Sequence, residues 1–331
     1  MGPAPITCDP NYEPYTKKPI NRLKIVHQNI KSPLLKVMLL SDGRLLIQLH
    51  NDYYIYNKDN PKEIDIKINN DAQFHSIIAE IDYRLIIENS GKLIQLEDKI
   101  YKFYNGLKDI FPSSALKLSN GLIIITNGKE YANQFINFCK LDKNEKKLIK
   151  EYEIKTKFHH LQNILEINPH MIMIYGSEFI NGEKSWLEFY NIKNKILVTK
   201  IILDENCLEK YPIMFGKDLL LLGGKNKFDM YNINKGYTIQ TIKTNDKYRM
   251  YRFLIINEHC FLGGDSAGNI YVFKEKNGNI TTRKTFRAHD KSIICLDRYN
   301  DNIIVTSSQD DVKFWDISEY LSYHFHFFFL L

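Results

Sequence analysis

His289, Thr306 and Asp310, near the end of the chain, carry an imidazole, a hydroxyl and a carboxylate. These are the three groups of a nucleophilic triad, in which the carboxylate orients the histidine and the histidine takes the proton of the attacking hydroxyl. Trp315 follows with an indole N–H, which needs a hydrogen-bond partner wherever it is buried. The set therefore invites comparison with a catalytic site.

Two histidine pairs, His159-His160 and the pair His324 and His326, raise the question of a metal site. Adjacent histidines point to opposite sides of an extended chain, and the second pair has no carboxylate or thiol nearby. Structural metal sites usually gather four ligands, and the chain offers no such set. The five cysteines show no CxxC or CxxxC spacing, and the Gly-Lys segments lack the spacing of a phosphate-binding loop. We expect free thiols, no metal and no cofactor.

An internal repeat supplies the elements that position these residues. The segment 287–316 contains three short strand-like runs separated by turn residues, and its last part recurs upstream. Each copy carries an aromatic residue or a leucine at the same place. These seven marker residues are Tyr56, Leu96, Phe138, Tyr190, Tyr231, Phe273 and Trp315. Most intervals are close to 42 residues; the one of 52, from Phe138 to Tyr190, coincides with a polar loop at 176–185.

The second repeat allows two registers. Its third strand is either the run ending at Leu96, or the run KIYKFYN, which would move the marker to Tyr104. We prefer Leu96, because the runs IIAEID and RLIIEN then supply the two preceding strands without a surplus.

The period and the order of His, Trp and Asp in the last repeat resemble the WD40-repeat family, whose repeats of about 40–45 residues each form one four-stranded blade of a β-propeller. The resemblance covers residues 22–317, and the last repeat is nearest to the family pattern. There Trp315-Asp316 matches the signature dipeptide, and the turn before it is one residue shorter than the family norm. The resemblance implies a buried, structural chain of hydrogen bonds in place of a triad. Its members would be His289, Thr306, Asp310 and Trp315.

The predicted fold is all-β: a single seven-bladed β-propeller of four-stranded antiparallel blades. One strand-like run, RLKIVHQ at 22–28, precedes the first repeat, and the last repeat supplies only three strands. We expect the N-terminal run to complete the last blade, so that no edge is left unpaired there. The expected organisation is a flexible arm at 1–21, the propeller at 22–317 and an aromatic tail at 318–331.

A partner would bind the loops, since the strands are committed to the scaffold. In the family the loops before each first strand and those joining second and third strands share one face. The loops there carry cations and aromatics, and the polar loop at 176–185 adds an apolar pair, a composition typical of interface hot spots. The predicted partner-binding residues are Phe179, Ile180, Lys247, Tyr248, Arg249, Arg287 and Lys291. We expect them to bind an acidic or phosphorylated peptide segment.

The resulting function hypothesis is a non-enzymatic scaffold or adaptor that binds other proteins. The net charge of +6 is modest, and acids are interleaved with bases at 140–155, which argues against a nucleic-acid partner. No apolar stretch approaches a membrane span and the N-terminus shows no signal-peptide core, so a cytoplasmic or nuclear protein is expected. The alternatives are an enzyme or small-ligand binder that uses the central channel, and anionic-lipid binding through the basic loops.

Overall fold

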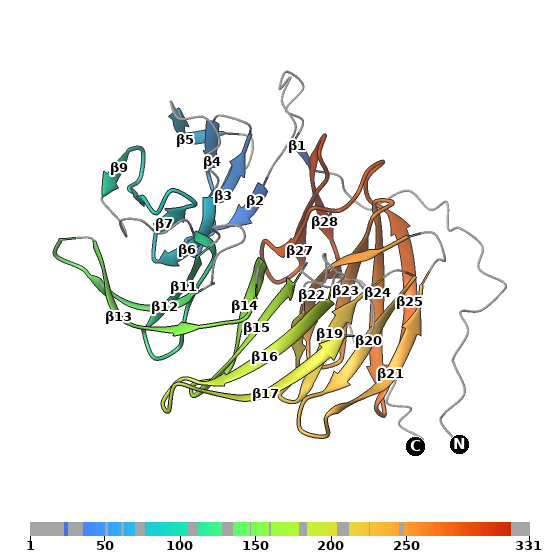
Figure 1. Cartoon of the computed structure of the whole chain (residues 1–331). Coiled ribbons are helices and arrows are strands. Elements are labelled where there is room, and N and C mark those ends of the chain that lie inside the picture. Colours follow the sequence, from blue (N-terminus) through green and yellow to red (C-terminus); the bar gives the residue numbers. More distant parts are fainter. Residues whose placement is uncertain are drawn as a thin grey trace, which may run out of the picture. The chain divides into compact units, whose positions relative to one another are not determined.

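The computed structural model describes residues 23–25, 36–49, 52–60, 63–69, 77–104, 112–127, 135–145, 147–158, 160–178, 184–203, 212–224, 226–244 and 248–318. Strands β1 to β28 form seven four-stranded antiparallel sheets (Figure 1). These sheets are the blades of a β-propeller, numbered 1 to 7 below, and the all-β fold that the repeats predict is confirmed.

Blades 1 to 4 belong to a compact unit spanning Leu35–Lys217. Blade 1 consists of β2 (Lys36–Leu39), β3 (Leu45–Gln48), β4 (Asp52–Tyr56) and β5 (Ile64–Asn69). Blade 2 consists of β6 (Ile77–Asp82), β7 (Leu85–Glu88), β8 (Leu93–Leu96) and β9 (Tyr101–Tyr104). Blade 3 consists of β10 (Pro112–Lys117), β11 (Ile123–Asn127), β12 (Phe135–Asp142) and β13 (Lys147–Lys155). Blade 4 consists of β14 (His160–Asn168), β15 (Met171–Glu178), β16 (Lys184–Asn191) and β17 (Ile196–Leu203).

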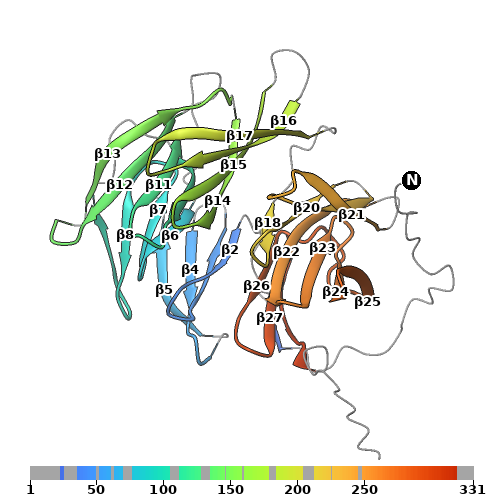
Figure 2. The same cartoon turned by 90° about the horizontal axis from the view of Figure 1, so that it is seen from below.

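The second unit joins Asp218–Leu331 with Met1–Leu34 and contains blades 6 and 7 and all of blade 5 except its first strand, β18, which falls in the Leu35–Lys217 unit (Figure 2). Blade 5 consists of β18 (Ile213–Phe215), β19 (Leu219–Gly223), β20 (Lys227–Asn232) and β21 (Tyr237–Lys243). Blade 6 consists of β22 (Met250–Asn257), β23 (Cys260–Asp265), β24 (Asn269–Lys276) and β25 (Asn279–Arg287). Blade 7 consists of β26 (Cys295–Arg298), β27 (Ile303–Ser307), β28 (Val312–Asp316) and β1 (Leu23–Ile25).

The burial pattern of each strand follows its place in the blade. The second strands β3 and β7 are buried at every position, and the two faces of β7 lie in apolar clusters shared with blade 1 and with blade 3. The outer strand β13 is mostly exposed and carries Lys and Glu, as expected for an edge that must resist pairing. The hydrophobic core is accordingly divided into clusters between adjacent blades, for example between blades 3 and 4 and between blades 6 and 7.

All seven marker residues lie on the third strand of their blades. In blade 2 this strand is β8, which ends at Leu96, whereas Tyr104 ends the outer strand β9, so the preferred register is confirmed. Five markers also coincide with an irregularity that the repeat pattern does not reveal. The pairing of third with fourth strand shifts register at Tyr56, Phe138, Tyr190, Tyr231 and Phe273. A β-bulge there increases the local twist of the blade.

Two strand boundaries differ from the predictions. The polar loop expected at 176–185 is shorter, because β15 continues to Glu178 and β16 begins at Lys184. The run beginning at Ser292 becomes a strand only at Cys295; the Ile293 N–H donates to the Asp265 carbonyl of blade 6, and the Ile294 N–H donates to the carbonyl of Ser307 at the end of β27.

Hydrogen bonds between residues one repeat apart tie neighbouring blades together. In blade 1 Asp42 accepts a hydrogen bond from Arg84 of blade 2 at 2.7 Å, 42 positions later. In blade 6 Arg252 donates to the Ile294 carbonyl at 2.9 Å, and Arg298 of blade 7 donates to the Ile256 carbonyl at 3.1 Å. Residues at equivalent positions of successive repeats therefore contact each other in the folded chain.

Gln240 joins the outer strands of blades 5 and 6 in the same way. Its amide nitrogen donates to the Ile280 carbonyl at 3.2 Å and its oxygen accepts from the Ile280 N–H at 3.0 Å. We expect Gln240→Leu to lower the free energy of unfolding by about 1–2 kcal/mol, because it leaves both backbone groups without this partner. Urea unfolding would measure the change. Thr238→Ala, at an exposed position of the same strand, should have almost no effect, and equal losses in the two variants would contradict the assignment.

Blade 7 is completed by the N-terminal run, as predicted. β1 pairs antiparallel with β28, with Leu23 opposite Phe314 and Ile25 opposite Val312. Residues 1–22 and 319–331, which include the predicted arm and most of the tail, lie outside the described residues.

Candidate functional site

The residues with triad chemistry meet inside blade 7. Trp315 Nε1 donates a hydrogen bond to Thr306 Oγ1 at 2.8 Å, and Thr306 Oγ1 lies 2.7 Å from His289 Nε2. The other ring nitrogen of His289, Nδ1, is hydrogen bonded to Asp311 Oδ1. A hydroxyl offers one donor and two acceptor positions, so Thr306 can form hydrogen bonds with the indole and the imidazole at the same time.

This chain resembles a triad in its order but not in its access to solvent. His289 is 1% exposed and Thr306 is fully buried. A nucleophile must reach a substrate carbonyl, and Thr306 instead receives the indole N–H of Trp315 on the oxygen that would attack. The arrangement ties β27, β28 and the loop before β26 to one another.

The acidic member of the chain is Asp311, so the prediction of Asp310 is wrong. A tight turn explains the difference. The Ser308 N–H donates to the Asp311 carbonyl at 3.0 Å, and the Asp310 N–H donates to Ser308 Oγ at 3.2 Å. The turn directs the Asp310 side chain outward, where it is 56% exposed and forms an ion pair with Lys291 at 2.9 Å. Two adjacent aspartates made the choice ambiguous in the sequence.

Lys313 also belongs to this site, although no sequence pattern pointed to it. Its ammonium lies 2.9 Å from Asp311 Oδ2 and donates to the Ala288 carbonyl at 2.7 Å. Burial alone would raise the pKa of Asp311, but hydrogen bonds with His289, Ser308 and Lys313 outweigh it and hold this pKa well below its usual range. The carboxylate therefore remains ionised and links His289 to Lys313.

Other blades carry buried acids of their own, which sequence reasoning missed. In blade 4 Glu188, 2% exposed, accepts from Trp186 Nε1 at 3.0 Å and from the Tyr190 hydroxyl at 2.6 Å. Burial and the bond to this carboxylate raise the pKa of Tyr190. In blade 6 Asp265, 1% exposed, accepts from the Tyr271 hydroxyl at 2.9 Å. In the sequence Glu188 lies two residues from both Trp186 and Tyr190, and Asp265 lies six residues before Tyr271. These spacings were the signal from which the buried acids could have been predicted.

In the second unit, turns between second and third strands meet the loops before the first strands of the following blades. The Met250 N–H donates to Gly224 in the turn of blade 5, at 3.1 Å. The His289 N–H donates to Gly268 in the turn of blade 6, at 3.0 Å. Gly268 has a φ of +88°, and a Cβ there would overlap the backbone oxygens of His289 and Lys291, so only glycine fits. We call the surface formed by residues 224 and 226, turns 265–269 and 308–311 and segments 248–249 and 288–294 the loop face.

Four predicted partner-binding residues are described, and all lie at the loop face or its margin. Tyr248 is half-buried and Arg249, beside the turn of blade 6, is exposed. Arg287 lies 3.4 Å from Asp290, and Lys291 pairs with Asp310, so acids partly neutralise the expected cationic rim. Phe179, Ile180 and Lys247 lie outside the described residues. Phe179 and Ile180 belong to the other unit, and their part in this face stays a prediction.

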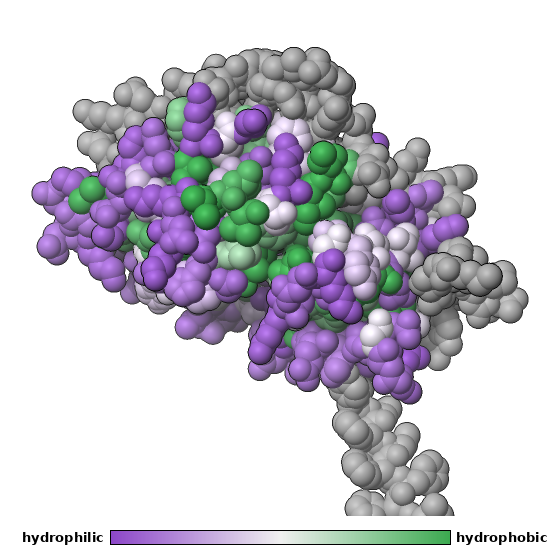
Figure 3. All heavy atoms as spheres, turned by 60° about the horizontal axis from the view of Figure 1, so that its bottom comes forward, coloured by the Kyte–Doolittle hydropathy of each residue, from purple (hydrophilic) through white to green (hydrophobic). Residues whose placement is uncertain are grey.

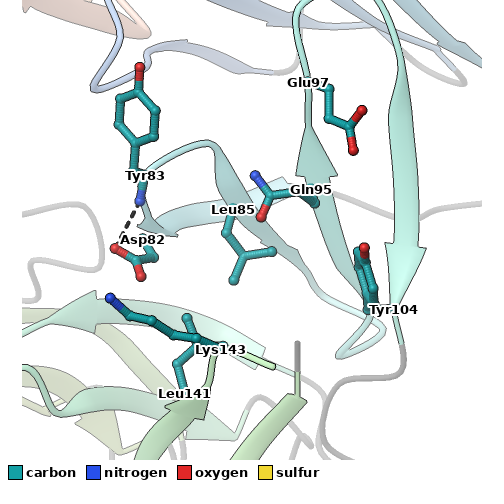
Figure 4. Close-up of a pocket in the computed structure, with 8 residues that line it drawn as sticks. All are labelled: Asp82, Tyr83, Leu85, Gln95, Glu97, Tyr104, Leu141 and Lys143. Carbon is teal, nitrogen blue, oxygen red and sulfur yellow. Dashed lines mark hydrogen bonds between the residues drawn. The ribbon is translucent and has the colours of Figure 1, made fainter. Parts of the chain in front are cut away.

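A cavity of about 450 Å³ lies between blades 2 and 3 (Figure 4). It is lined by Asp82, Tyr83, Leu85, Gln95, Glu97, Tyr104, Leu141 and Lys143. Its acids are engaged, since Asp82 pairs with Lys117 at 2.6 Å and Glu97 with Lys102 at 2.7 Å. Burial would raise the pKa of Asp82, but hydrogen bonds with Lys117 and the Tyr83 N–H outweigh it and lower the pKa. A carboxylate with a lowered pKa is a weak proton acceptor, which makes this an unpromising site for acid–base catalysis.

The chain matches no protein-family model, and no curated protein is similar to it in sequence. The fold and the geometry of the described residues must therefore carry the functional argument. Across the described ranges, no three His, Cys, Asp or Glu side chains gather as metal ligands would. His159, His324 and His326 are not among the described residues, and of His160 only the backbone is described. Within the same ranges, no helix has the length and apolar character needed to span a membrane.

Proposed function

We propose that the chain is a degenerate WD-repeat propeller that acts as a non-enzymatic scaffold or adaptor for other proteins. The observation that supports this proposal is the position of the triad-like residues inside blade 7, where Thr306 and His289 have almost no exposed surface. β-Propellers have many different functions, so the function of one must be inferred from its site. In blade 7 the side chains that could do catalytic chemistry serve as structural links.

The charged residues of the first strands support the same conclusion. An enzyme that used a central channel would place acids and histidines on these strands with their functional groups free. Glu80 instead accepts hydrogen bonds from Ser41 and Arg84, and Glu166 accepts from Ser119. Arg252 and Arg298 donate to carbonyls of adjacent blades, as described above. These side chains hold blades together and have little left for a substrate.

A binding role fits the loop face better. Arg249, Arg287 and Lys291 are exposed there, and the pairs of Arg287 and Lys291 with aspartates are of the weak surface kind, worth about 0–1 kcal/mol. An acidic or phosphorylated peptide segment could displace these aspartates and form stronger charge-assisted hydrogen bonds with the guanidinium groups. The buried free thiols of Cys139, Cys260 and Cys295 fit a reducing compartment such as the cytoplasm or nucleus.

We expect the double variant Arg249→Glu/Arg287→Glu to lose a protein partner while its melting temperature stays close to that of the unchanged protein. The measurement is affinity purification from native cells followed by mass spectrometry. The matched control is Lys276→Glu/Arg283→Glu, which makes the same charge change at exposed positions of the hairpin β24–β25. A partner retained by the loop-face variant, or lost equally in the control, would refute the loop face as the binding surface.

A result with no specific partner in any sample would instead favour the alternatives. Flotation with vesicles containing anionic lipid then tests membrane-surface binding, and thermal shifts with small metabolites test a ligand in the channel. Binding in either assay that persists in the loop-face variant would overturn the adaptor proposal.

A further inference from the structure

Strand β17, the outer strand of blade 4, carries an unusual concentration of exposed apolar side chains. Ile196 is 53%, Leu197 47%, Val198 50% and Ile202 67% exposed. These are four of the ten large apolar side chains that are exposed in the described part of the chain. Figure 3 shows apolar surface gathered among hydrophilic residues on the side of the molecule where Figure 1 places β17. A cluster of this kind on one element is typical of an interaction surface.

The backbone of β17 is also available for pairing. The sheet order is β14-β15-β16-β17, so within the described residues no strand lies along the outer edge of β17. The strand is eight residues long and pairs with β16 along nearly its whole length, from Ile196 opposite Asn191 to Leu203 opposite Ser185. A long edge with apolar side chains is the geometry to which an extended segment adds as a further strand.

Two other long outer strands, β13 and β25, carry more charged residues than β17. Strand β13 carries five Lys and Glu residues, two of which, Lys150 and Glu153, pair at 2.9 Å. Strand β25 carries Arg283, Lys284 and Arg287. Strand β17, with the sequence ILVTKIIL, has Lys200 as its single charge. The contrast indicates that its edge is kept open for a partner, since charged residues are the usual protection against unwanted pairing.

The charges on β17 and in the turn before it are all positive, and the acids Asp204 and Glu205 follow the strand in the sequence. From Ile192 to Leu203 the chain contains Lys193, Lys195 and Lys200 and no acidic residue. The ammonium of Lys195 lies 4.0 Å from the ring centre of Tyr152, and that of Lys200 lies 3.5 Å from the ring of Trp186. Cation–π contacts of this kind hold the two ammonium groups beside the strand. A second copy of β17 would bring lysines against lysines, which is unfavourable, whereas an acidic segment would complement them.

We propose that β17 is a second partner-binding surface, which takes an extended protein segment with apolar and acidic side chains on the same face as a fifth strand of blade 4. Apolar side chains of the segment would cover Leu197 and Ile202, while its carboxylates would approach Lys195 and Lys200. The surface lies in the Leu35–Lys217 unit and is independent of the loop face, so each surface can fail its test without the other.

The test is a selection of random linear octapeptides displayed on phage against the full chain, with counter-selection against Ile202→Glu. Selected peptides are expected to carry an apolar and an acidic residue two positions apart, because Ile202 and Lys200 lie two positions apart on one face of β17. In fluorescence anisotropy, the best synthetic peptide should bind at least about tenfold more weakly to Ile202→Glu and to Lys200→Glu, a change of about 1.4 kcal/mol per tenfold. Ile149→Glu, at an exposed apolar position of β13, is the matched control and should bind within about twofold of the unchanged protein.

Two further measurements identify the mode of binding. Hydrogen exchange of the β17 amides should slow when the peptide binds, and a peptide N-methylated at alternate residues should lose affinity, because it cannot complete the ladder of hydrogen bonds. Peptides that lack acids, or that bind Ile202→Glu unchanged, would overturn the proposal. A dimer detected by light scattering and abolished by Ile202→Glu would overturn it too, because the occupant would then be a second copy. Failure to select any peptide that distinguishes the two proteins would also refute it.

Discussion

Trp315→Ala is expected to lower the free energy of unfolding by about 3–5 kcal/mol, the largest effect of any single change considered for this chain. The indole is 4% exposed and lies 5.1 Å, centre to centre, from the ring of Phe286 in the cluster between blades 6 and 7. Its removal leaves a cavity and takes the N–H donor away from Thr306. Urea unfolding measures the loss, and hydrogen exchange of the β27 and β28 amides should show it concentrated in blade 7. Tyr237→Ala, at an aromatic residue that is 52% exposed, serves as the control.

The hydrogen bonds can be separated from the packing with Thr306→Val, which keeps the volume and removes the hydroxyl. His289 Nε2 and Trp315 Nε1 then lose their shared partner, and the expected cost is about 2–3 kcal/mol. Thr282→Val makes the same chemical change at an exposed position of β25 and should be nearly neutral. If both threonine variants were neutral, the network would not stabilise the blade.

Asp311→Asn should lower the free energy of unfolding by about 2–3 kcal/mol at pH 7, because the hydrogen bonds from His289, Ser308 and Lys313 lose a charged acceptor. Asp310→Asn, one residue earlier, removes only an exposed ion pair with Lys291 and should change stability by less than about 0.5 kcal/mol. Urea unfolding of the two variants tests directly which aspartate belongs to the network. Equal effects, or a larger effect at Asp310, would contradict the structure.

The same pair of variants gives a pH dependence with a defined sign. The pKa of Asp311 in the folded protein is lower than the value of about 3.9 typical of an unfolded chain. Its contribution is therefore fully present above the unfolded pKa and is lost as the pH falls below about 4 toward the folded pKa. The difference in stability between the unchanged protein and Asp311→Asn should stay constant from pH 7 to 5 and shrink below pH 4. A difference that grew on acidification would contradict this sign.

The fold was accessible from sequence because each repeat carries its own copy of the pattern. The marker residues lie on third strands since a buried side chain is needed at the same place in every blade, and the surplus run at 22–28 indicated the strand that completes blade 7. The bulges beside five markers were not accessible, because they depend on twist and not on residue type. The hydrogen-bonded site was predicted apart from its acid and Lys313: the geometry of a four-residue turn decides between Asp310 and Asp311, and composition does not.

The surface of blade 4 shows a different limit of sequence reasoning. The run ILVTKIIL is an ordinary strand pattern, and nothing in it tells a buried strand from an outer one. Only the sheet order places it at an edge and turns its apolar residues into surface. The buried acids Glu188 and Asp265 were missed for the opposite reason, because charged residues are normally assigned to solvent unless a partner is known.

The pairing of β1 with β28 has a consequence for how the protein is made. Strand β1 is synthesised roughly 290 residues before its partner β28, which at about 5–20 residues per second means a wait of about 15–60 s. Blades 1 to 6 can assemble in order during this interval, each from a continuous stretch of chain. Blade 7 is completed only after translation has passed Asp316, so the growing chain carries an unsatisfied N-terminal strand throughout its synthesis. The newly made protein should therefore be most dependent on chaperones just before this last strand docks.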